Sequence, residues 1–320
     1  LPPTSFSPSR LKEYLNPEIP IVQNAMEHPD SFYSQDLVLI INSDSKEFTT
    51  TDYWDGKSAT NGHVVELHKI KRMVFLFNFL ISPSRYLNQI GARGPSIGII
   101  TTNTKFYDEV TSQDRYEFIR RYPRIRLESP IDPNTVTTEK TTSEQIRVGM
   151  HSKGLGNKWN DDIPYVIAKL NERYPDLPFK FRFMGMSATC RKLIEKSKFT
   201  NVECLPENTE TIKEFLSNLD IFMFFPSWGR EEPWARVVGE AMMSGCPVFA
   251  TDKGGNKDQV LKYHNGHLNK RKDDFVKTLC HAKEHPNTIL EMGANSRRIA
   301  YTTFRTEKII QRLADLIESM

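Results

Sequence analysis

The sequence predicts an α/β protein whose second half is a doubly wound parallel sheet. After residue 145, short apolar segments alternate strictly with helical patterns, and these segments are apolar throughout, as in strands buried on both faces. Strands are expected at 146–149, 179–184, 202–205, 221–225 and 247–250, with helices at 163–172, 189–196, 209–219 and 233–244. Such sheets bind ligands at the carboxyl ends of their strands, so the loops there should carry the functional residues.

The first half also predicts α/β structure, in a less regular pattern. Strands are expected at 36–42, 73–81, 96–101 and 124–128, helices at 83–90 and 112–121, and a polar loop at 48–62. The segment 132–145 holds five threonines and one apolar residue, which is typical of an interdomain linker. We therefore expect an N-terminal lobe at 1–131, this linker, a Rossmann-like lobe at 146–300 and a C-terminal helix at 301–320.

Charge and composition exclude several classes of protein. The 320 residues carry 43 Lys and Arg against 40 Asp and Glu, and a formal charge of +3 is too small for a protein that coats nucleic acid. The longest apolar run, at 73–81, is shorter than the ~20 residues of a membrane span. The four cysteines form no Cys-x-x-Cys pair, which argues against a zinc ribbon or a disulfide scaffold. We expect a cytoplasmic protein, either free or peripheral at the membrane surface, without a nucleic acid partner.

The most informative stretch runs from 225 to 248 and reads FPSWGREEPWARVVGEAMMSGCPV. A strand is expected to end at Phe225, Pro233 stands where a first helical residue belongs, and Gly245 suits the position after a helix. The free amides at this helix start, with the positive end of the helix dipole, predict a site for a phosphate or a carboxylate.

Two glutamates in this stretch differ in how readily packing explains them. Glu232 precedes the expected helix, where a carboxylate is commonly a cap. Glu240 lies on a helix that should be largely buried, and an unpaired buried carboxylate is costly. It must pair with an Arg or Lys, or accept hydrogen bonds from ligand hydroxyls such as the vicinal diol of a ribose. The sequence leaves both alternatives open.

The Glu-x7-Glu pair, in its strand–loop–helix–strand setting, closely resembles the signature of retaining GT-B glycosyltransferases of the family 4 type. The resemblance covers about 146–266 and, more loosely, the final helices. It implies two Rossmann-like lobes, with the nucleotide-sugar donor in the second and the acceptor in the first, which is reduced or atypical here. It also implies that the C-terminal helix packs back toward the first lobe.

The resemblance assigns roles to individual residues. Glu232 would be the catalytic residue beside the transferred sugar, and Glu240 would bind the donor ribose. The amides at Trp234 and Ala235 would meet the sugar and phosphates. The phosphate-side turn after the next strand would be Gly254, Gly255 and Asn256.

The resemblance places the contacts to the donor diphosphate in the loop after the first strand of the second lobe. Many family members carry an Arg where this chain has Met150, so Lys153 and Lys158 in the following Gly-rich loop are expected to supply the charge. Lys158 is the stronger candidate. Further candidates for donor contacts are His151, Arg230, Arg236 and Asn208.

The expected function is transfer of a sugar from a nucleotide-sugar donor to a saccharide, lipid-linked or protein-linked acceptor, with retention of anomeric configuration. No cofactor or metal is expected. The acidic pairs at 161–162 and 273–274 are adjacent residues, so neither forms the Asp-x-Asp motif by which GT-A transferases bind a metal. Two alternatives remain: a nucleotide-sugar epimerase of the same architecture, and a noncatalytic protein that binds nucleotide sugars or polyanions. The arginine-rich segment 115–126 is either a solvated face or a dock for an anionic acceptor or a membrane surface.

Overall fold

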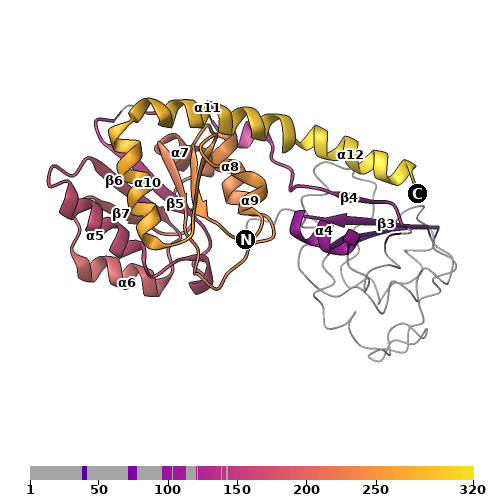
Figure 1. Ribbon diagram of the computed structural model, residues 1–320, viewed down its shortest axis with the longest axis horizontal. Coiled ribbons are helices and arrows are strands. Elements are labelled where there is room, and N and C mark those ends of the chain that lie inside the picture. The colour runs from indigo at the N-terminus through magenta and orange to yellow at the C-terminus, as the bar shows by residue number, and fades with distance from the viewer. Residues whose placement is uncertain are drawn as a thin grey trace. The chain divides into compact units, whose positions relative to one another are not determined.

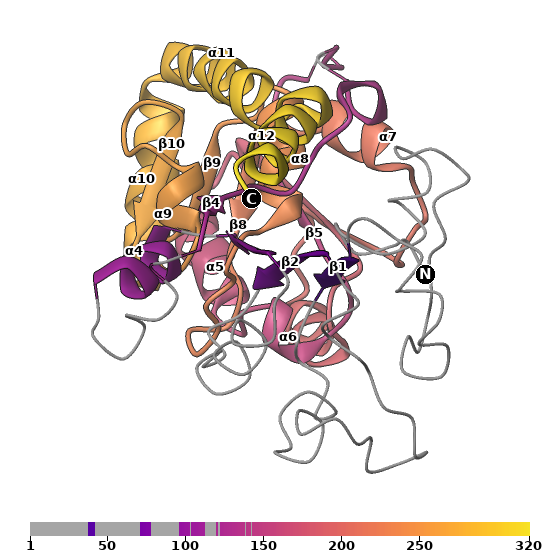
Figure 2. The same cartoon turned by 90° about the vertical axis from the view of Figure 1, so that its right-hand side faces the viewer.

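The structure is a computed structural model, shown in two views in Figures 1 and 2. It describes residues 38–41, 71–77, 96–102, 104–112, 120, 122–137, 139–141 and 143–320. Contacts divide the chain into two compact units. Unit 1 comprises Leu1–Ser129 with Ile309–Met320, and unit 2 comprises Pro130–Lys308.

Unit 2 is built on a six-stranded sheet in which all the pairs are parallel. Its order is β10-β9-β8-β5-β6-β7, so the chain winds from β5 toward one edge and from β8 toward the other. The topological switch point therefore lies between β5 and β8, which is where such sheets bind ligands. The strands are β5 (Ile146–His151), β6 (Phe179–Met184), β7 (Val202–Leu205), β8 (Ile221–Phe224), β9 (Val248–Thr251) and β10 (Gly266–Asn269).

Helices cover this sheet in two groups. One group has α5 against α6 and α10, and the other has α8 against α9 and α11; Figure 1 shows α8 and α9 on the side of the strands away from α5. None of the helices in the described part of the chain is long and apolar enough to cross a bilayer. The helices of unit 2 are α5 (Ile163–Arg173), α6 (Ala188–Ser197), α7 (Ile212–Ser217), α8 (Arg236–Met243), α9 (Asn256–Gln259), α10 (Lys272–Glu284) and α11 (Pro286–Thr303), and the chain continues into α12 (Thr306–Glu318).

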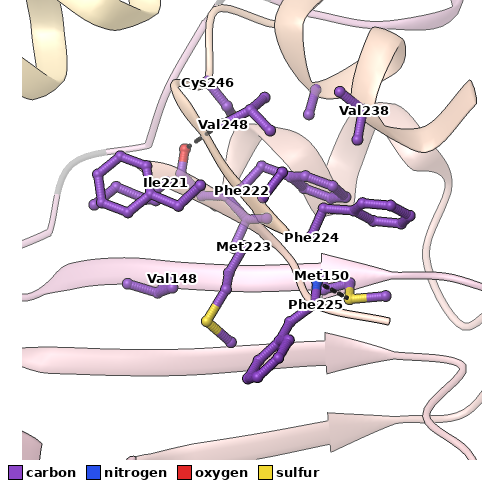
Figure 3. Packing of buried hydrophobic residues seen from close by; sticks show 14 of the residues in the cluster. Val148, Met150, Ile221, Phe222, Met223, Phe224, Phe225, Val238, Cys246 and Val248 are labelled. Atoms are coloured by element: carbon purple, nitrogen blue, oxygen red, sulfur yellow. Dashed lines mark hydrogen bonds between the residues drawn. The ribbon is translucent and has the colours of Figure 1, made fainter. Parts of the chain in front are cut away.

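The core of unit 2 forms around its central strands, of which β8 and β9 are buried along their whole length. All four residues of β8 are buried, and Figure 3 shows them with Val148 and Met150 of the neighbouring strand β5. The amide of Phe225 approaches the sulfur of Met150 at 3.5 Å, which ties the end of β8 to β5. The predicted doubly wound parallel sheet is confirmed. The strand β10 was not expected, because its sequence, Gly-His-Leu-Asn, buries two polar side chains.

The threonine-rich segment 132–145, expected to be a linker, lies within unit 2. Val136 is buried in the core of this unit. The amide of Thr141 donates to the Ser217 carbonyl at 3.2 Å, and its hydroxyl accepts from Arg147. The segment is thus attached mainly by hydrogen bonds, which a composition with one apolar residue does not reveal.

The described residues of unit 1 form a four-stranded parallel sheet in the order β1-β2-β3-β4. Figure 2 shows β1 and β2 side by side. The described strands lie where strands were expected, whereas the helix α4 at Thr104–Ser112 was not expected. The expected helix at 83–90, the loop at 48–62 and almost all of the expected helix at 112–121 lie outside the described residues. The elements are β1 (Val38–Ile41), β2 (Arg72–Phe77), β3 (Ser96–Thr101), α4 (Thr104–Ser112) and β4 (Arg124–Arg126).

The C-terminal helix α12 contributes to the core of unit 1. Ile309 and Leu316 are buried in one cluster with Val74, Ile100 and Leu127. On the same helix, Arg312 pairs with the buried carboxylate of Glu128. The apolar stripe of α12 therefore covers the sheet of unit 1, although the contact division falls within the helix, after Lys308.

Truncating Leu316 tests this packing. Leu316→Ala is expected to lower the free energy of unfolding of unit 1 by about 2–5 kcal/mol, because it leaves a cavity in a small core. Ile310→Ala, on the same helix but 42% exposed, is the matched control and should cost less than about 0.5 kcal/mol. Denaturant unfolding measures both, and equal midpoints for the two variants would contradict the packing of α12 in this core.

Candidate active site

Two loops meet at the carboxyl end of the unit 2 sheet, one after β5 and one after β8. The side-chain amide of Asn160 donates to the Pro226 carbonyl at 2.9 Å, and the indole of Trp228 donates to Asp162 at 2.9 Å. The Ser227 amide donates to the Asn157 carbonyl at 3.3 Å. These bonds join the loops at the switch point of the sheet, so side chains from both can reach one ligand.

Glu232, in the loop after β8, lies between two cations. Its side chain is 9% exposed, and Oε1 accepts from Arg230 Nε at 2.6 Å and pairs with Lys158 from the other loop. Burial on its own raises the pKa of Glu232, but the Arg230 and Lys158 charges more than offset it and hold the pKa below its ordinary value. Glu232 is therefore ionised at neutral pH, and three predicted site residues form one cluster.

Glu240, on α8, is also buried, at 8% exposed, and its two oxygens differ. Oε1 accepts from Arg236 Nε at 2.7 Å, one helical turn earlier. Oε2 lies 3.7 Å from His151 Nε2 and has no hydrogen bond among the described residues. The structure thus shows pairing within the protein for one oxygen, and the other remains available to a ligand hydroxyl.

His151 is the last residue of β5 and links that strand to Glu240. It is 5% exposed and packs edge-on against Phe215 and Phe222, with ring centroids 5.7 and 5.6 Å away. Burial lowers the pKa of His151; the Glu240 charge opposes this shift and the Arg236 charge adds to it. His151 Nε2 is buried without a hydrogen-bond partner in the described part of the chain. A neutral imidazole therefore borders the free oxygen of Glu240.

The start of α8 differs from the prediction. The helix begins at Arg236 instead of Pro233, and Ala235 is its N-cap residue. The Ala235 amide, expected to be free for a ligand, donates to Gln259 Oε1 at 3.2 Å. The ring of Trp234 packs edge-on against Phe304 at 5.2 Å and contacts α8 at Gly239. The contact with Gln259 therefore occupies the Ala235 amide, which the local sequence pattern predicts to be free.

The turn after β9 lies directly against the Glu232 loop. The Gly255 amide donates to the Glu232 carbonyl at 2.8 Å, and a Cβ at Gly255 would collide with the Pro233 carbonyl oxygen. Gly254 adopts a φ of +52°, and a Cβ there would meet the backbone of Glu232. The side chain of Asn256 donates to the Thr251 carbonyl at 2.9 Å, which stabilises the turn itself. The close packing of the turn against the Glu232 loop therefore accounts for glycine at both positions, with no need for a ligand contact.

The remaining candidates are less closely connected. The carbonyl of Lys153 accepts from the indole of Trp159 at 3.0 Å, and its ammonium has no partner among the described residues. Asn208 is exposed in the turn after β7, with a φ of +60°. Sequence reasoning missed Lys253, whose ammonium donates to the Trp228 carbonyl and so joins the glycine turn to the loop after β8. Its position directly before Gly-Gly was the available signal.

A cavity of about 580 Å³ lies elsewhere in unit 2, beside β10 and α10. It is lined by residues such as Lys262, Tyr263, His267 and Lys277, and it includes none of the predicted site residues. Its lysines are exposed. The buried carboxylates and their cations, away from this cavity, therefore define the candidate site.

Comparison with known proteins shows what this chain is similar to. Residues 149–299 match the family model of "Glycosyl transferases group 1". The chain resembles HepE of Anabaena, solved in complex with UDP and glucose, with a TM-score of 0.64 over 94% of this chain and 84% of that one at 17% identity. At this identity the likeness concerns the fold alone, and it confirms the predicted GT-B fold.

Curated relatives match over a short part of their length. Spore coat protein SA of Bacillus subtilis is 30% identical over 106 residues, which is 31% of this chain and 26% of that protein. Trehalose synthase of Pyrococcus horikoshii is 29% identical over 89 residues, which is 28% of this chain and 21% of that protein. The matched parts thus span about a quarter of the relatives' length.

Acidification is expected to destabilise the protein through its buried histidines. The folded-state pKa of His151 lies below its ordinary value, so the unfolded chain binds the proton first and the free energy of unfolding falls below about pH 6.5. His267 acts in the same direction, because burial, His281 and Lys262 lower its pKa to about 4. His151→Gln should therefore remove part of the slope.

Urea unfolding at pH 7.5, 6.5 and 5.5 measures this slope. Leu290→Gln, at a residue that is 74% exposed and binds no proton, is the control and should keep the wild-type slope. If His151→Gln keeps it as well, the imidazole is not held neutral by its surroundings.

Proposed function

We propose that this chain is a glycosyltransferase that moves a sugar from a nucleotide-sugar donor to the hydroxyl of an acceptor. The observation that carries the proposal is the pair of buried glutamates, Glu232 and Glu240, beside the carboxyl ends of β8 and β5. Doubly wound sheets bind nucleotides at this position. Because HepE was solved with UDP and glucose, a uridine diphosphate sugar is the first donor to test.

Glu240 supports the proposal through its free oxygen. A ribose diol could donate a hydrogen bond to Oε2 while Oε1 stays paired with Arg236. The neighbouring neutral His151 adds no competing positive charge. A carboxylate that is already oriented by Arg236 loses little freedom on binding, which favours affinity.

Lys158, Arg230 and Glu232 provide the charges that sugar transfer requires. The departing diphosphate gains negative charge, and the sugar develops positive charge like that of an oxocarbenium ion. Lys158 and Arg230 would stabilise the diphosphate, and Glu232 would stabilise the sugar. Without a donor the two cations pair with Glu232 instead. The diphosphate would compete for these cations and leave the Glu232 carboxylate facing the sugar.

Retention of configuration and independence from metal are further parts of the proposal. The Glu-x7-Glu pattern resembles that of retaining enzymes, in which the acceptor attacks from the face that the diphosphate leaves. The cations at Lys158, Arg230 and Lys153 offer the charge that a metal would otherwise supply. The acceptor class, a saccharide or a lipid-linked or protein-linked group, is proposed from the same resemblance.

Charge removal separates the roles of the two glutamates. Glu240→Gln should weaken donor affinity by about 10- to 150-fold, the worth of a charge-assisted hydrogen bond, and change kcat less. Glu232→Gln should instead lower kcat more than it raises KM, because the charge it stabilises appears in the transition state. Calorimetry with UDP and release of labelled sugar from UDP-glucose measure the two effects.

The control is Glu203→Gln on β7, since Glu203 also pairs with an arginine, Arg182, at 2.7 Å. This variant should bind and turn over donor like the wild type. Wild-type donor affinity in Glu240→Gln would show that Glu240 only pairs within the protein. Donor epimerised without acceptor would show an isomerase, and donor left intact by the wild type with every acceptor would show a binding protein.

Transfer is expected to persist in excess EDTA. If Lys158 and Arg230 stabilise the leaving diphosphate, chelation should change the rate less than two-fold, whereas Lys158→Met should lower kcat. Initial rates with EDTA, and with Mg²⁺ or Mn²⁺ added back, make the comparison. Activity that disappears in EDTA and returns with metal would contradict this part of the proposal.

A further inference from the structure

A buried amide side chain outside the predicted site holds the loop that carries Glu232. Gln259 is the last residue of α9 and is 0% exposed. Its Oε1 accepts from the Ala235 amide at 3.2 Å, and its Nε2 donates to the Ala235 carbonyl at 2.9 Å. One side chain thus binds both polar groups of a residue 24 positions away in sequence.

The Gln259 contact is one of several that join the two segments. The Gly255 amide, on the same turn, donates to the Glu232 carbonyl at 2.8 Å. Behind Gln259, the side chain of Asn265 donates to the Gln259 carbonyl at 3.0 Å, and Ser296 of α11 donates to the Asn265 carbonyl at 2.9 Å. The loop at 232–235 is therefore connected through buried hydrogen bonds to α11.

Ala235 is the residue through which this network reaches the candidate site. It is the N-cap of α8, three residues after Glu232 and five before Glu240. Its carbonyl also accepts the amides of Val238 and Gly239, the first bonds of the helix. A shift of Ala235 would thus displace the loop that carries Glu232 relative to α8.

We propose that Gln259 is a positioning residue for the sugar transfer proposed above, on which this inference rests. Gln259 fixes Ala235 and thereby the distance between the Glu232 carboxylate and the start of α8. It also occupies the Ala235 amide, so the first α8 amides left for a phosphate or sugar oxygen are those of Arg236 and Val237. Gln259 touches neither donor nor acceptor in this account.

Loss of the Gln259 side-chain bonds should act on the transition state more than on donor binding. A misplacement of about 1 Å at reacting groups can cost on the order of 100-fold in rate. The ribose contact of Glu240 is set mainly by Arg236 on the same helix, so donor affinity should change little. The signature of a positioning role is therefore a fall in kcat at nearly constant KM.

Gln259→Met tests the inference in the full chain, because methionine keeps the volume and removes both bonds. The control is Asn201→Leu at another buried amide, 7% exposed, which donates to the Phe179 carbonyl at 2.9 Å at the opposite edge of the sheet. Both variants should lower the melting temperature. Gln259→Met should also lower kcat about 10- to 100-fold with donor KM within about three-fold, and Asn201→Leu should leave kcat within two-fold. Equal kcat in the two variants would overturn the proposal.

Gln259→Glu keeps the test valid if the methionine variant fails to fold. Glutamate retains the acceptor for the Ala235 amide and loses the donor to the Ala235 carbonyl. The kcat of Gln259→Glu should therefore lie between those of the wild type and Gln259→Met. If only the glutamate variant folds, its kcat should lie below that of the wild type. A kcat equal to wild type would overturn the positioning role.

Hydrogen–deuterium exchange without any donor separates this inference from the proposed function. Amides at 232–240 should exchange faster in the Gln259 variants and at the wild-type rate in Asn201→Leu. This result would support the role of Gln259 in positioning the loop, whether or not the wild type transfers sugar. A wild type that transfers no sugar would count against the proposed function alone. Unchanged exchange in the Gln259 variants would overturn the inference whatever the activity.

Discussion

The candidate site depends on the close approach of two backbone segments in unit 2, the turn at 252–259 and the loop at 232–235. Gly254 and Gly255 have no room for a Cβ against Glu232 and Pro233, and the Gly255 amide bonds to the Glu232 carbonyl. Any larger residue would push the loop outward. Because the turn follows β9 and the loop follows β8, the parallel sheet itself sets the spacing of the two segments.

Charge balance is the second requirement of this arrangement. A carboxylate as buried as Glu232 is stable only with compensating cations, which Arg230 and Lys158 provide. A bound diphosphate would need the same two cations. In the site without donor, Glu232 pairs with these cations instead. In contrast, Glu240 keeps one oxygen outside its ion pair with Arg236. This oxygen can accept a hydrogen bond from the ligand while the ion pair stays intact.

The sequence predicted the architecture of unit 2 well, because central strands such as β8 are buried on both faces and form continuous apolar runs. It also showed that Glu240 needed a partner, and the spacing of Arg236 four residues earlier was the local signal for which one. The start of α8 was less predictable. The rule that places proline first in a helix is local, whereas the contact that sets Ala235 comes from Gln259. The strand β10 escaped notice because His267 and Asn269 are buried in it despite their polarity.

A crystal structure of the full chain with UDP tests the central claim most directly. The account predicts the ribose hydroxyls within hydrogen-bond distance of Glu240 and the diphosphate against Lys158 or Arg230, with at least one of these cations withdrawn from Glu232. UDP bound elsewhere, for example in the lysine-lined cavity beside β10, with the Lys158–Glu232–Arg230 cluster unchanged, would contradict it.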